Sequence, residues 1–312
     1  MRLVTFVPRK GAAPRVGLMH GGNHVIDLTQ VGGKPPFDPT DMMSLVAAGA
    51  KGLAWLRKIA AKEKKSLPFG KVKLLAPIPR PRKNVFCVGW NYVEHFEESR
   101  VSRLHTVEFP AHPTFFSKVR TTVIGPYDPV PVHADVTAQL DWEVELGVVI
   151  GKRGINIGEA DALKHVFGYT VVNDISARDI QRRHGGQLFK GKGLDGTCPM
   201  GPWIVTADEV PDPHALRLAS RVNGATKQDS NTSCMYFKIP RLIAELSAGL
   251  TLEPGDILST GTPAGVGHAR TPPEFMKAGD MLETEVYGVG LLRNRIGTRR
   301  QVALKPDATA PV

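Results

Sequence analysis

The run Asp141-Trp-Glu-Val-Glu-Leu-Gly-Val-Val-Ile-Gly151 constrains the fold more than any other part of the chain. Its apolar half, Leu146 to Ile150, is typical of a buried strand. Because side chains of a strand alternate between its faces, Glu143 and Glu145 are expected to share one face, with Asp141 below them. Carboxylates gathered beside an apolar run repel one another and are costly to bury unless a cation neutralises them. The pattern therefore predicts either a cation site or a solvated strand face.

A further acidic residue ends the next strong strand pattern, Val166 to Asp174. If Asp174 lies beside the acidic strand, it completes a set of three carboxylates. Hard cations such as Mg²⁺ prefer such oxygen ligands, with water or substrate filling the remaining positions. The alternative is that Asp174 only caps a helix that begins after it, over residues 175–181.

A histidine and a glutamate share one face of a short predicted helix, Asn91 to Glu98. Asn91 is a suitable N-cap, and His95 and Glu98 are three residues apart. A carboxylate that orients an imidazole provides the general base needed to activate water. The alternative is a surface helix pair without a catalytic role. Residues 99–113 show little periodicity and are predicted to form a loop that can move.

Two other segments offer contacts to an anion. Residues 187–195 are predicted to be a loop with Lys190 and Lys192, and a lysine near an enolate would stabilise its charge. Residues 257–267 are predicted to be a strand that runs into a glycine-rich loop. Backbone N–H groups of this loop and the hydroxyl of Thr262 could approach an anion. For the lysines, the alternative is a solvated loop.

The net charge of +10, from 40 basic and 30 acidic residues, makes nucleic acid the first partner to consider. The basic residues are scattered and do not alternate with aromatic ones, so an anionic small molecule is favoured. No apolar run reaches the length of about 18 residues needed for a membrane span, and no secretory leader is expected at the N-terminus. The cysteines, Cys87, Cys198 and Cys234, are widely spaced, which predicts no disulfide framework and a cytoplasmic location.

The chain is predicted to consist of a small N-terminal α+β domain, residues 1–78, a catalytic domain, residues 79–297, and a tail, residues 298–312. Proline-dense residues 76–83 mark the boundary between the domains. Within the first domain, strands are expected over residues 3–7, 15–19 and 24–28, and helices over residues 41–50 and 52–62.

Four segments resemble the fumarylacetoacetate hydrolase family in their order and spacing. They begin at Phe86 (Phe-Cys-Val-Gly-Trp-Asn-Tyr), Asp141 (Asp-Trp-Glu-Val-Glu-Leu-Gly), Gly168 (Gly-Tyr-Thr-Val-Val-Asn-Asp-Ile-Ser-Ala-Arg-Asp) and Thr260 (Thr-Gly-Thr-Pro-Ala-Gly-Val-Gly). The resemblance covers about residues 80–297. It implies an α+β chain that is mostly β, with a mixed β-sheet roll, and a homodimer. It also implies a divalent-metal enzyme that acts on 2-oxo or β-diketo acids.

The resemblance further implies a role for individual residues. Mg²⁺ or Mn²⁺ would be held by Glu143, Glu145 and Asp174, catalysis would involve His95, Glu98 and Lys192, and substrate would contact Arg178, Gln181 and Thr262. Asp141 lies outside the family's usual ligands and is expected to support them.

The expected reaction is hydrolysis of a C–C bond in an acylpyruvate-like or 2,4-diketo acid, by water that His95 deprotonates. The metal and Lys192 would stabilise the enolate that leaves. Two alternatives keep the site and change the reaction: decarboxylation of a 2-oxo acid such as oxaloacetate, and isomerisation or hydration of a 2-hydroxyhepta-2,4-diene-1,7-dioate-type acid. Each fits aromatic or sugar-acid catabolism. A metal- or ligand-binding protein without catalysis is a further alternative, as is a nucleic-acid-binding module.

Overall fold

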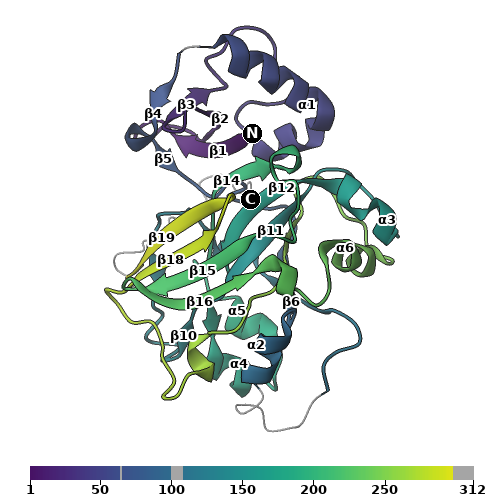
Figure 1. The fold of residues 1–312 in the computed structure, drawn as a ribbon. Coiled ribbons are helices and arrows are strands. Elements are labelled where there is room, and N and C mark those ends of the chain that lie inside the picture. The colour runs from purple at the N-terminus through teal and green to yellow at the C-terminus, as the bar shows by residue number, and fades with distance from the viewer. Residues whose placement is uncertain (64, 100–107, 298–312) are drawn as a thin grey trace, which may run out of the picture.

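The computed structural model describes residues 1–63, 65–99 and 108–297, and its main feature is a mixed sheet of twelve strands (Figure 1). From one edge to the other its strands are β4 (Leu67–Pro68), β3 (His24–Asp27), β2 (Arg15–His20), β1 (Arg2–Val7), β14 (Cys198–Thr206), β12 (Val166–Asn173), β11 (Val144–Ile150), β17 (Ile257–Ser259), β6 (Val85–Gly89) and β7 (Thr114–Lys118), with β5 (Lys73–Leu74) beside β1 and β8 (Val123–Ile124) beside β14.

A second sheet packs on the first (Figure 1). Its strands are β16 (Ala225–Asn231), β15 (Arg217–Val222), β18 (Met281–Val286), β19 (Gly290–Gly297) and β9 (Val130–Pro131), and a separate short pair joins β10 (Leu140–Asp141) to β13 (Ser176–Ala177). Asn173 of β12 links the two large sheets by donating a hydrogen bond of 2.8 Å to the hydroxyl of Thr284 in β18. The predicted mixed β-sheet roll is confirmed.

Strand β11 is buried on both of its faces. Val144, Leu146 and Val148 pack into the core that the first sheet shares with β15 and β18. Val149 points the other way, into a core that β11 shares with the leading segment. Burial on both faces explains why the run after the acids is continuously apolar rather than alternating.

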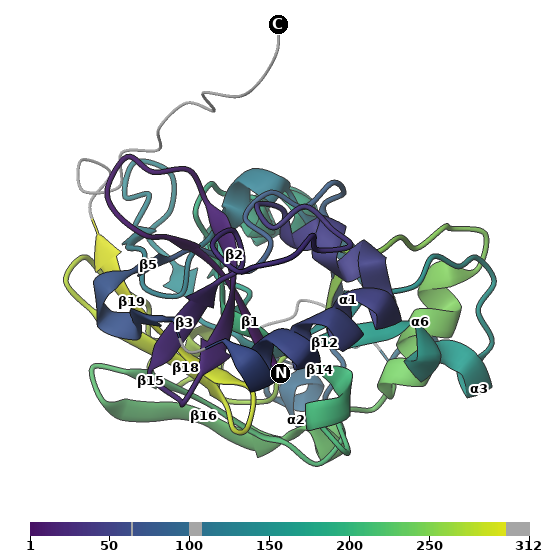
Figure 2. The same ribbon diagram turned by 90° about the horizontal axis from the view of Figure 1, so that it is seen from above.

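The N-terminal segment adds strands and one long helix, α1 (Met42–Lys62), to this framework (Figure 2). The side chain of Asp41 caps α1 by accepting hydrogen bonds from the N–H groups of Met43 and Ser44. Gly49 has a φ of +50° and divides α1 in two, in agreement with the two predicted helices. Because β1 pairs with β14, the sheet continues across residue 78, and an independent N-terminal domain stays a prediction.

The other helices are short and three of them, α2, α4 and α5, gather at one end of the roll (Figure 1). They are α2 (Val93–Glu98), α3 (Glu159–Ala162), α4 (Arg178–Arg183), α5 (Leu188–Lys192) and α6 (Ile239–Ser247), and 3₁₀ turns cover Phe69–Lys71, Arg120–Thr122, Leu163–His165, Ala207–Glu209, Thr232–Cys234 and Gly267–Ala269. In the described part of the chain, no helix has both the length and the apolar character to cross a membrane.

Three local predictions are wrong. Asn91 does not cap α2, because the helix begins at Val93 and the Asn91 side chain donates to the carbonyls of Phe237 and Thr260. Residues 187–195 are not simply a loop, because α5 forms there; it packs so closely on α4 that a Cβ at Gly191 would lie 2.3 Å from Gln181 Cγ. The strand predicted over residues 141–151 is interrupted between Asp141 and Val144, because side-chain amides take the place of ladder partners there. Residues 100–107 of the predicted mobile loop and the predicted tail lie outside the described residues.

Candidate active site

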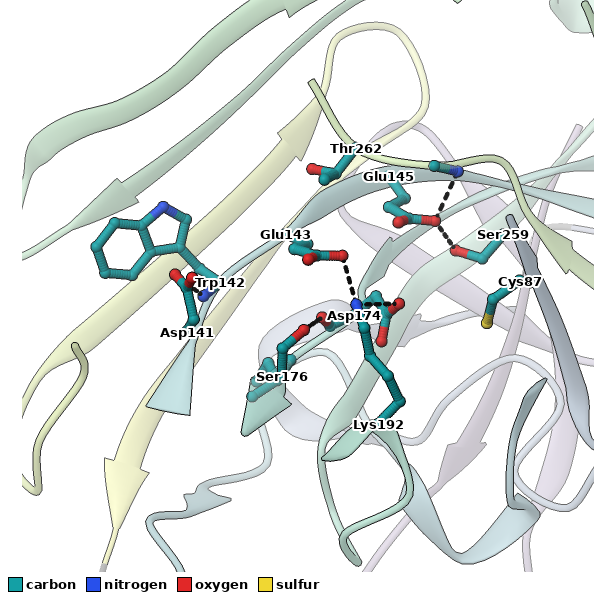
Figure 3. Close-up of polar contacts among 12 residues, drawn as sticks. Cys87, Asp141, Trp142, Glu143, Glu145, Asp174, Ser176, Lys192, Ser259 and Thr262 are labelled. Atoms are coloured by element: carbon teal, nitrogen blue, oxygen red, sulfur yellow. Dashed lines mark hydrogen bonds and ion pairs between the residues drawn. The ribbon is translucent and has the colours of Figure 1, made fainter. Parts of the chain in front are cut away.

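Three carboxylates converge where β11 begins and the antiparallel strand β12 ends (Figure 3). The N–H of Asp174 donates a hydrogen bond of 2.9 Å to the carbonyl of Glu143, which places Asp174 opposite the acidic pair. One oxygen from each of Glu143, Glu145 and Asp174 lies within 4.8 Å of the others, and all three side chains are buried. The alternative that Asp174 merely caps a helix does not hold, since α4 begins only at Arg178.

The charges around the three carboxylates are unevenly distributed. Lys192 Nζ lies 2.7 Å from Glu143 and 2.8 Å from Asp174, and Lys118 Nζ lies 2.9 Å from the other oxygen of Asp174. Burial raises the pKa of Glu143, but the charges of Lys192 and Arg178 outweigh it and lower that pKa to about 2. Glu145 differs: burial and the nearby Asp174 and Glu143 carboxylates raise its pKa well above its usual value.

This imbalance fits a divalent cation. Among the described residues Glu145 forms no ion pair, and a dication beside it would offset the burial and the neighbouring carboxylates that raise its pKa. The donors are all carboxylate oxygens, the set that Mg²⁺ and Mn²⁺ prefer. The residues present therefore fit the implied metal.

Asp141 is separate from this triad (Figure 3). Its carboxylate accepts hydrogen bonds from the N–H groups of Trp142 and Gly267, at 2.8 and 2.7 Å, and from Arg178 Nε at 2.8 Å. Burial raises the pKa of Asp141, but the Arg178 guanidinium and the hydrogen bonds from His268 hold it far below its usual range. The expectation of a third acid directly below Glu143 and Glu145 in one strand is wrong, because the strand is interrupted between these residues. Asp141 supports Arg178 instead.

The predicted histidine–glutamate pair is formed on α2. His95 Nδ1 lies 2.8 Å from Glu98 Oε1, and His95 is 5 % exposed. The second oxygen of Glu98 accepts a hydrogen bond of 2.8 Å from the N–H of Gly265. Since a carboxylate can only accept, the Nδ1 of His95 carries hydrogen, and Nε2 of a neutral ring offers its lone pair. Glu98 thus orients the imidazole and also ties α2 to the glycine-rich loop.

The glycine-rich loop binds anions, but the anions are the protein's own carboxylates. Its N–H groups at Gly261, Gly265 and Gly267 donate to Glu145, Glu98 and Asp141, at 2.9, 2.8 and 2.7 Å. Glycine is required for this close approach. A Cβ at position 265 would lie 2.2 Å from a carbonyl oxygen, and one at position 267 would lie 2.1 Å from another.

One cavity of about 180 Å³ brings the predicted residues together. Among the residues that line it are His95, Glu143, Lys192, Arg178, Gln181, Thr262 and His268. Its volume is well below the ~300–1,000 Å³ of sites for drug-sized ligands, so it suits a small ligand. Glu145 and Asp174 are buried and are not among the lining residues, and Glu98 contacts His95, which lines the cavity.

The three predicted substrate contacts differ in how they are engaged. Arg178 is held between Asp141 and Glu143, at 2.8 and 2.7 Å. The hydroxyl of Thr262 donates to the carbonyl of Val144, so its hydrogen is not available to an anion. Gln181 is the contact that can still donate to a ligand, because within the described residues its buried side-chain nitrogen has no hydrogen-bond partner.

Sequence reasoning missed two residues at this site. Lys118 ends β7 with a side chain that is 0 % exposed, and His268 follows the last glycine of the loop and lines the cavity. A lysine that ends the apolar pattern Thr-Phe-Phe-Ser-Lys was a usable signal for Lys118. Nothing in the local pattern around His268 distinguishes it from a loop histidine.

Comparisons with known proteins agree with this geometry. Residues 84–297 match the model of the fumarylacetoacetate (FAA) hydrolase C-terminal family. The chain is 45% identical over 294 residues to the oxaloacetate tautomerase YisK of Bacillus subtilis, covering 90% of this chain and 96% of that one. It is 44% identical over 301 residues to the human mitochondrial oxaloacetate tautomerase FAHD2A, covering 95% and 91%.

Among solved structures, the maleylpyruvate hydrolase of Sphingobium sp. SYK-6, in complex with manganese (II) ion and pyruvate, superposes with a TM-score of 0.76. Its sequence is 30% identical, and the match covers 96% of this chain and 99% of that one. On the family match and the two tautomerase relatives, the chain belongs to the fumarylacetoacetate hydrolase family.

Proposed function

We propose that the protein catalyses keto–enol tautomerisation of a small 2-oxo dicarboxylic acid of the oxaloacetate type, with Mg²⁺ or Mn²⁺ bound by Glu143, Glu145 and Asp174. The observation that carries the proposal is that one small cavity is lined both by Glu143 of this acidic triad and by His95 of the His95–Glu98 pair. The names of the tautomerase relatives support this substrate class. A bound dication would supply Lewis-acid polarisation of the 2-oxo group.

The chain's own residues provide the proton chemistry. The Nε2 of His95 accepts a proton from the carbon next to the 2-oxo group, or returns it, while Glu98 holds the ring. Lys192 places an ammonium beside the developing enolate; burial lowers the pKa of Lys192, but Asp174 and Glu143 outweigh it and raise that pKa, so the ammonium keeps its charge. The free amide nitrogen of Gln181 donates to a substrate oxygen.

A second candidate reaction is the C–C bond hydrolysis expected from the sequence. The structural similarity to a maleylpyruvate hydrolase bound to manganese and pyruvate favours it, since the same histidine–glutamate pair can activate water. Decarboxylation of the oxo acid shares the enolate with both reactions and requires no water attack. The three reactions differ in their products.

The test is a product assay with Mg²⁺ or Mn²⁺ present. Enol oxaloacetate and a panel of acylpyruvates are supplied, loss of enol absorbance is followed, and products are identified by NMR. Tautomerisation yields keto oxaloacetate without pyruvate, whereas decarboxylation yields pyruvate and CO₂, and acylpyruvate hydrolysis yields pyruvate and a second acid. Enol loss no faster than in buffer would rule out the proposed function.

Two variants connect the assay to the site. His95→Ala should lower the rate by about 10²–10⁴. His112→Ala is the matched control, because His112 also pairs with a glutamate, Glu245, at 3.1 Å, but its side chain is 72 % exposed. We further propose a homodimer located in the cytoplasm, and light scattering of the purified protein tests the dimer.

A further inference from the structure

A second histidine–carboxylate pair lines the same cavity as the first. His268 follows Gly267 in the glycine-rich loop, lines the cavity with His95, and has a side chain that is 11 % exposed. Its backbone N–H donates to Asp141 Oδ2 at 3.0 Å, and its ring Nδ1 lies 3.3 Å from the same oxygen. Both ends of the residue are therefore held by one carboxylate.

The geometry determines which ring nitrogen faces the substrate. Asp141 has only acceptor lone pairs and already accepts hydrogen bonds from Trp142, Gly267 and Arg178. The Nδ1 that faces it must carry hydrogen, so a neutral ring presents a lone pair at Nε2. Among the described residues, the ring of His268 makes its polar contact through Nδ1, and no hydrogen bond is formed at Nε2. Burial and the charge of Arg178 lower the pKa of His268 despite Asp141, which favours the neutral ring.

We propose that His268, positioned by Asp141, is the second proton-transfer residue of the site and handles the proton on the substrate oxygen, while His95 handles the proton on carbon. This inference rests on the proposed tautomerase function. Keto–enol conversion moves a proton between an oxygen and a carbon two atoms away, and one fixed imidazole serves both atoms poorly. Two oriented imidazoles on one cavity serve each atom separately.

The step is balanced in protons and electrons. In the enol-to-keto direction, Nε2 of His268 accepts the hydroxyl proton, and the O–H bonding pair becomes the second bond of the C=O group. The electron pair of the C=C bond forms a C–H bond with the proton from the imidazolium of His95. One proton has moved from His95 to His268, and exchange with water restores both rings.

The test uses His268→Asn, because the asparagine amide can still donate to Asp141 in place of Nδ1 while Nε2 is lost. The control is His165→Asn: His165 is also buried, with Nδ1 2.9 Å from the Lys152 carbonyl, but is not among the residues that line the cavity. Enol loss by His268→Asn with Mg²⁺ should fall by about 10² or more. Deuterium exchange at the carbon next to the oxo group of keto oxaloacetate needs only His95 and should persist.

A second measurement needs neither metal nor turnover. Ring ¹⁵N NMR of the metal-free protein should show a histidine protonated at Nδ1 that disappears in His268→Asn. Protonation at Nε2, enol loss as fast as in the control, or an equal fall of enol loss and carbon exchange would each overturn the inference. The enol assay of the wild type separates failure of this inference from failure of the proposed function. If the proposed function is wrong, the wild type does not speed enol loss at all.

Discussion

Lys118 is the most informative residue to replace, because its buried ammonium contacts both Asp174 and the backbone of Lys192. Its side chain and that of Asp174 are both 0 % exposed, and the two form an ion pair of 2.9 Å. The same ammonium donates to the carbonyls of Ile175 and Lys192, at 3.0 and 2.5 Å. One buried cation thus holds a predicted metal ligand and the backbone of the neighbouring lysine.

Lys118→Met keeps the length and most of the volume of the side chain and removes its charge. Breaking a buried pair by removing one partner costs about 3–5 kcal/mol, and each buried acceptor left without a donor costs about 1–3 kcal/mol. Lys192 still neutralises part of the charge on Asp174, at 2.8 Å, so the lower part of the combined range applies. The combined range is about 5–11 kcal/mol, and we expect a loss near its lower end, about 5 kcal/mol, in the free energy of unfolding of the metal-free protein.

The assay is urea unfolding followed by tryptophan fluorescence, with and without saturating Mg²⁺. A dication beside Asp174 replaces the lost charge, so Mg²⁺ should recover part of the stability. The control is Lys164→Met, which removes a shorter ion pair, 2.6 Å to Asp161, whose side chains are 72% and 62% exposed. Exposed pairs contribute little, so the control should unfold like the wild type. If Lys118→Met also unfolds like the wild type without metal, the reasoning from burial is refuted.

Three further predictions follow from the site. Glu143→Gln should weaken Mg²⁺ binding and remove activity, as calorimetry and the enol assay would report, and activity with undiminished metal binding would contradict the ligand assignment. Because the pKa of Glu145 is raised, metal must displace its proton; affinity should rise with pH, and calorimetry in buffers of different ionisation enthalpy should detect proton release. The same raised pKa means that the metal-free fold loses stability as pH rises through it. Gly265 has a φ of +105°, and a Cβ added there would lie 2.2 Å from the Lys227 carbonyl oxygen. Gly265→Ala should therefore displace the N–H that donates to Glu98 and lower kcat. An unchanged kcat would show that this hydrogen bond is dispensable.

The parts of the site that follow from local periodicity could be predicted. Alternation along a strand places Glu143 and Glu145 together, and a spacing of three residues on a helix places His95 against Glu98. Both relations are confirmed. One oxygen of each triad member lies within 4.8 Å of the others, and His95 Nδ1 lies 2.8 Å from Glu98 Oε1. Their roles as ligands and base stay predictions.

The parts that depend on distant contacts could not be predicted. Asp141 leaves the strand face because donors about 37 and 126 positions away, Arg178 and Gly267, take its carboxylate. His268 gains its orientation from the same residue, across 127 positions. The helix α5 replaces a predicted loop because Gly191 allows close contact with α4, although glycine is itself unfavourable inside a helix.

The glycine-rich loop explains why these distant contacts act together. Three of its N–H groups donate to carboxylates. These are Glu145 of the acidic triad, Glu98 of the His95–Glu98 pair, and Asp141, which orients His268. The loop between Gly261 and Gly267 is short, and a Cβ at Gly261, Gly265 or Gly267 would lie 2.7, 2.2 or 2.1 Å from a neighbouring group, so the loop is closely packed. We expect that a movement of α2 that pulls Glu98 from Gly265 also shifts the backbone that holds the other two acids. The acidic triad and both histidines should consequently be positioned together, when α2 lies against the loop.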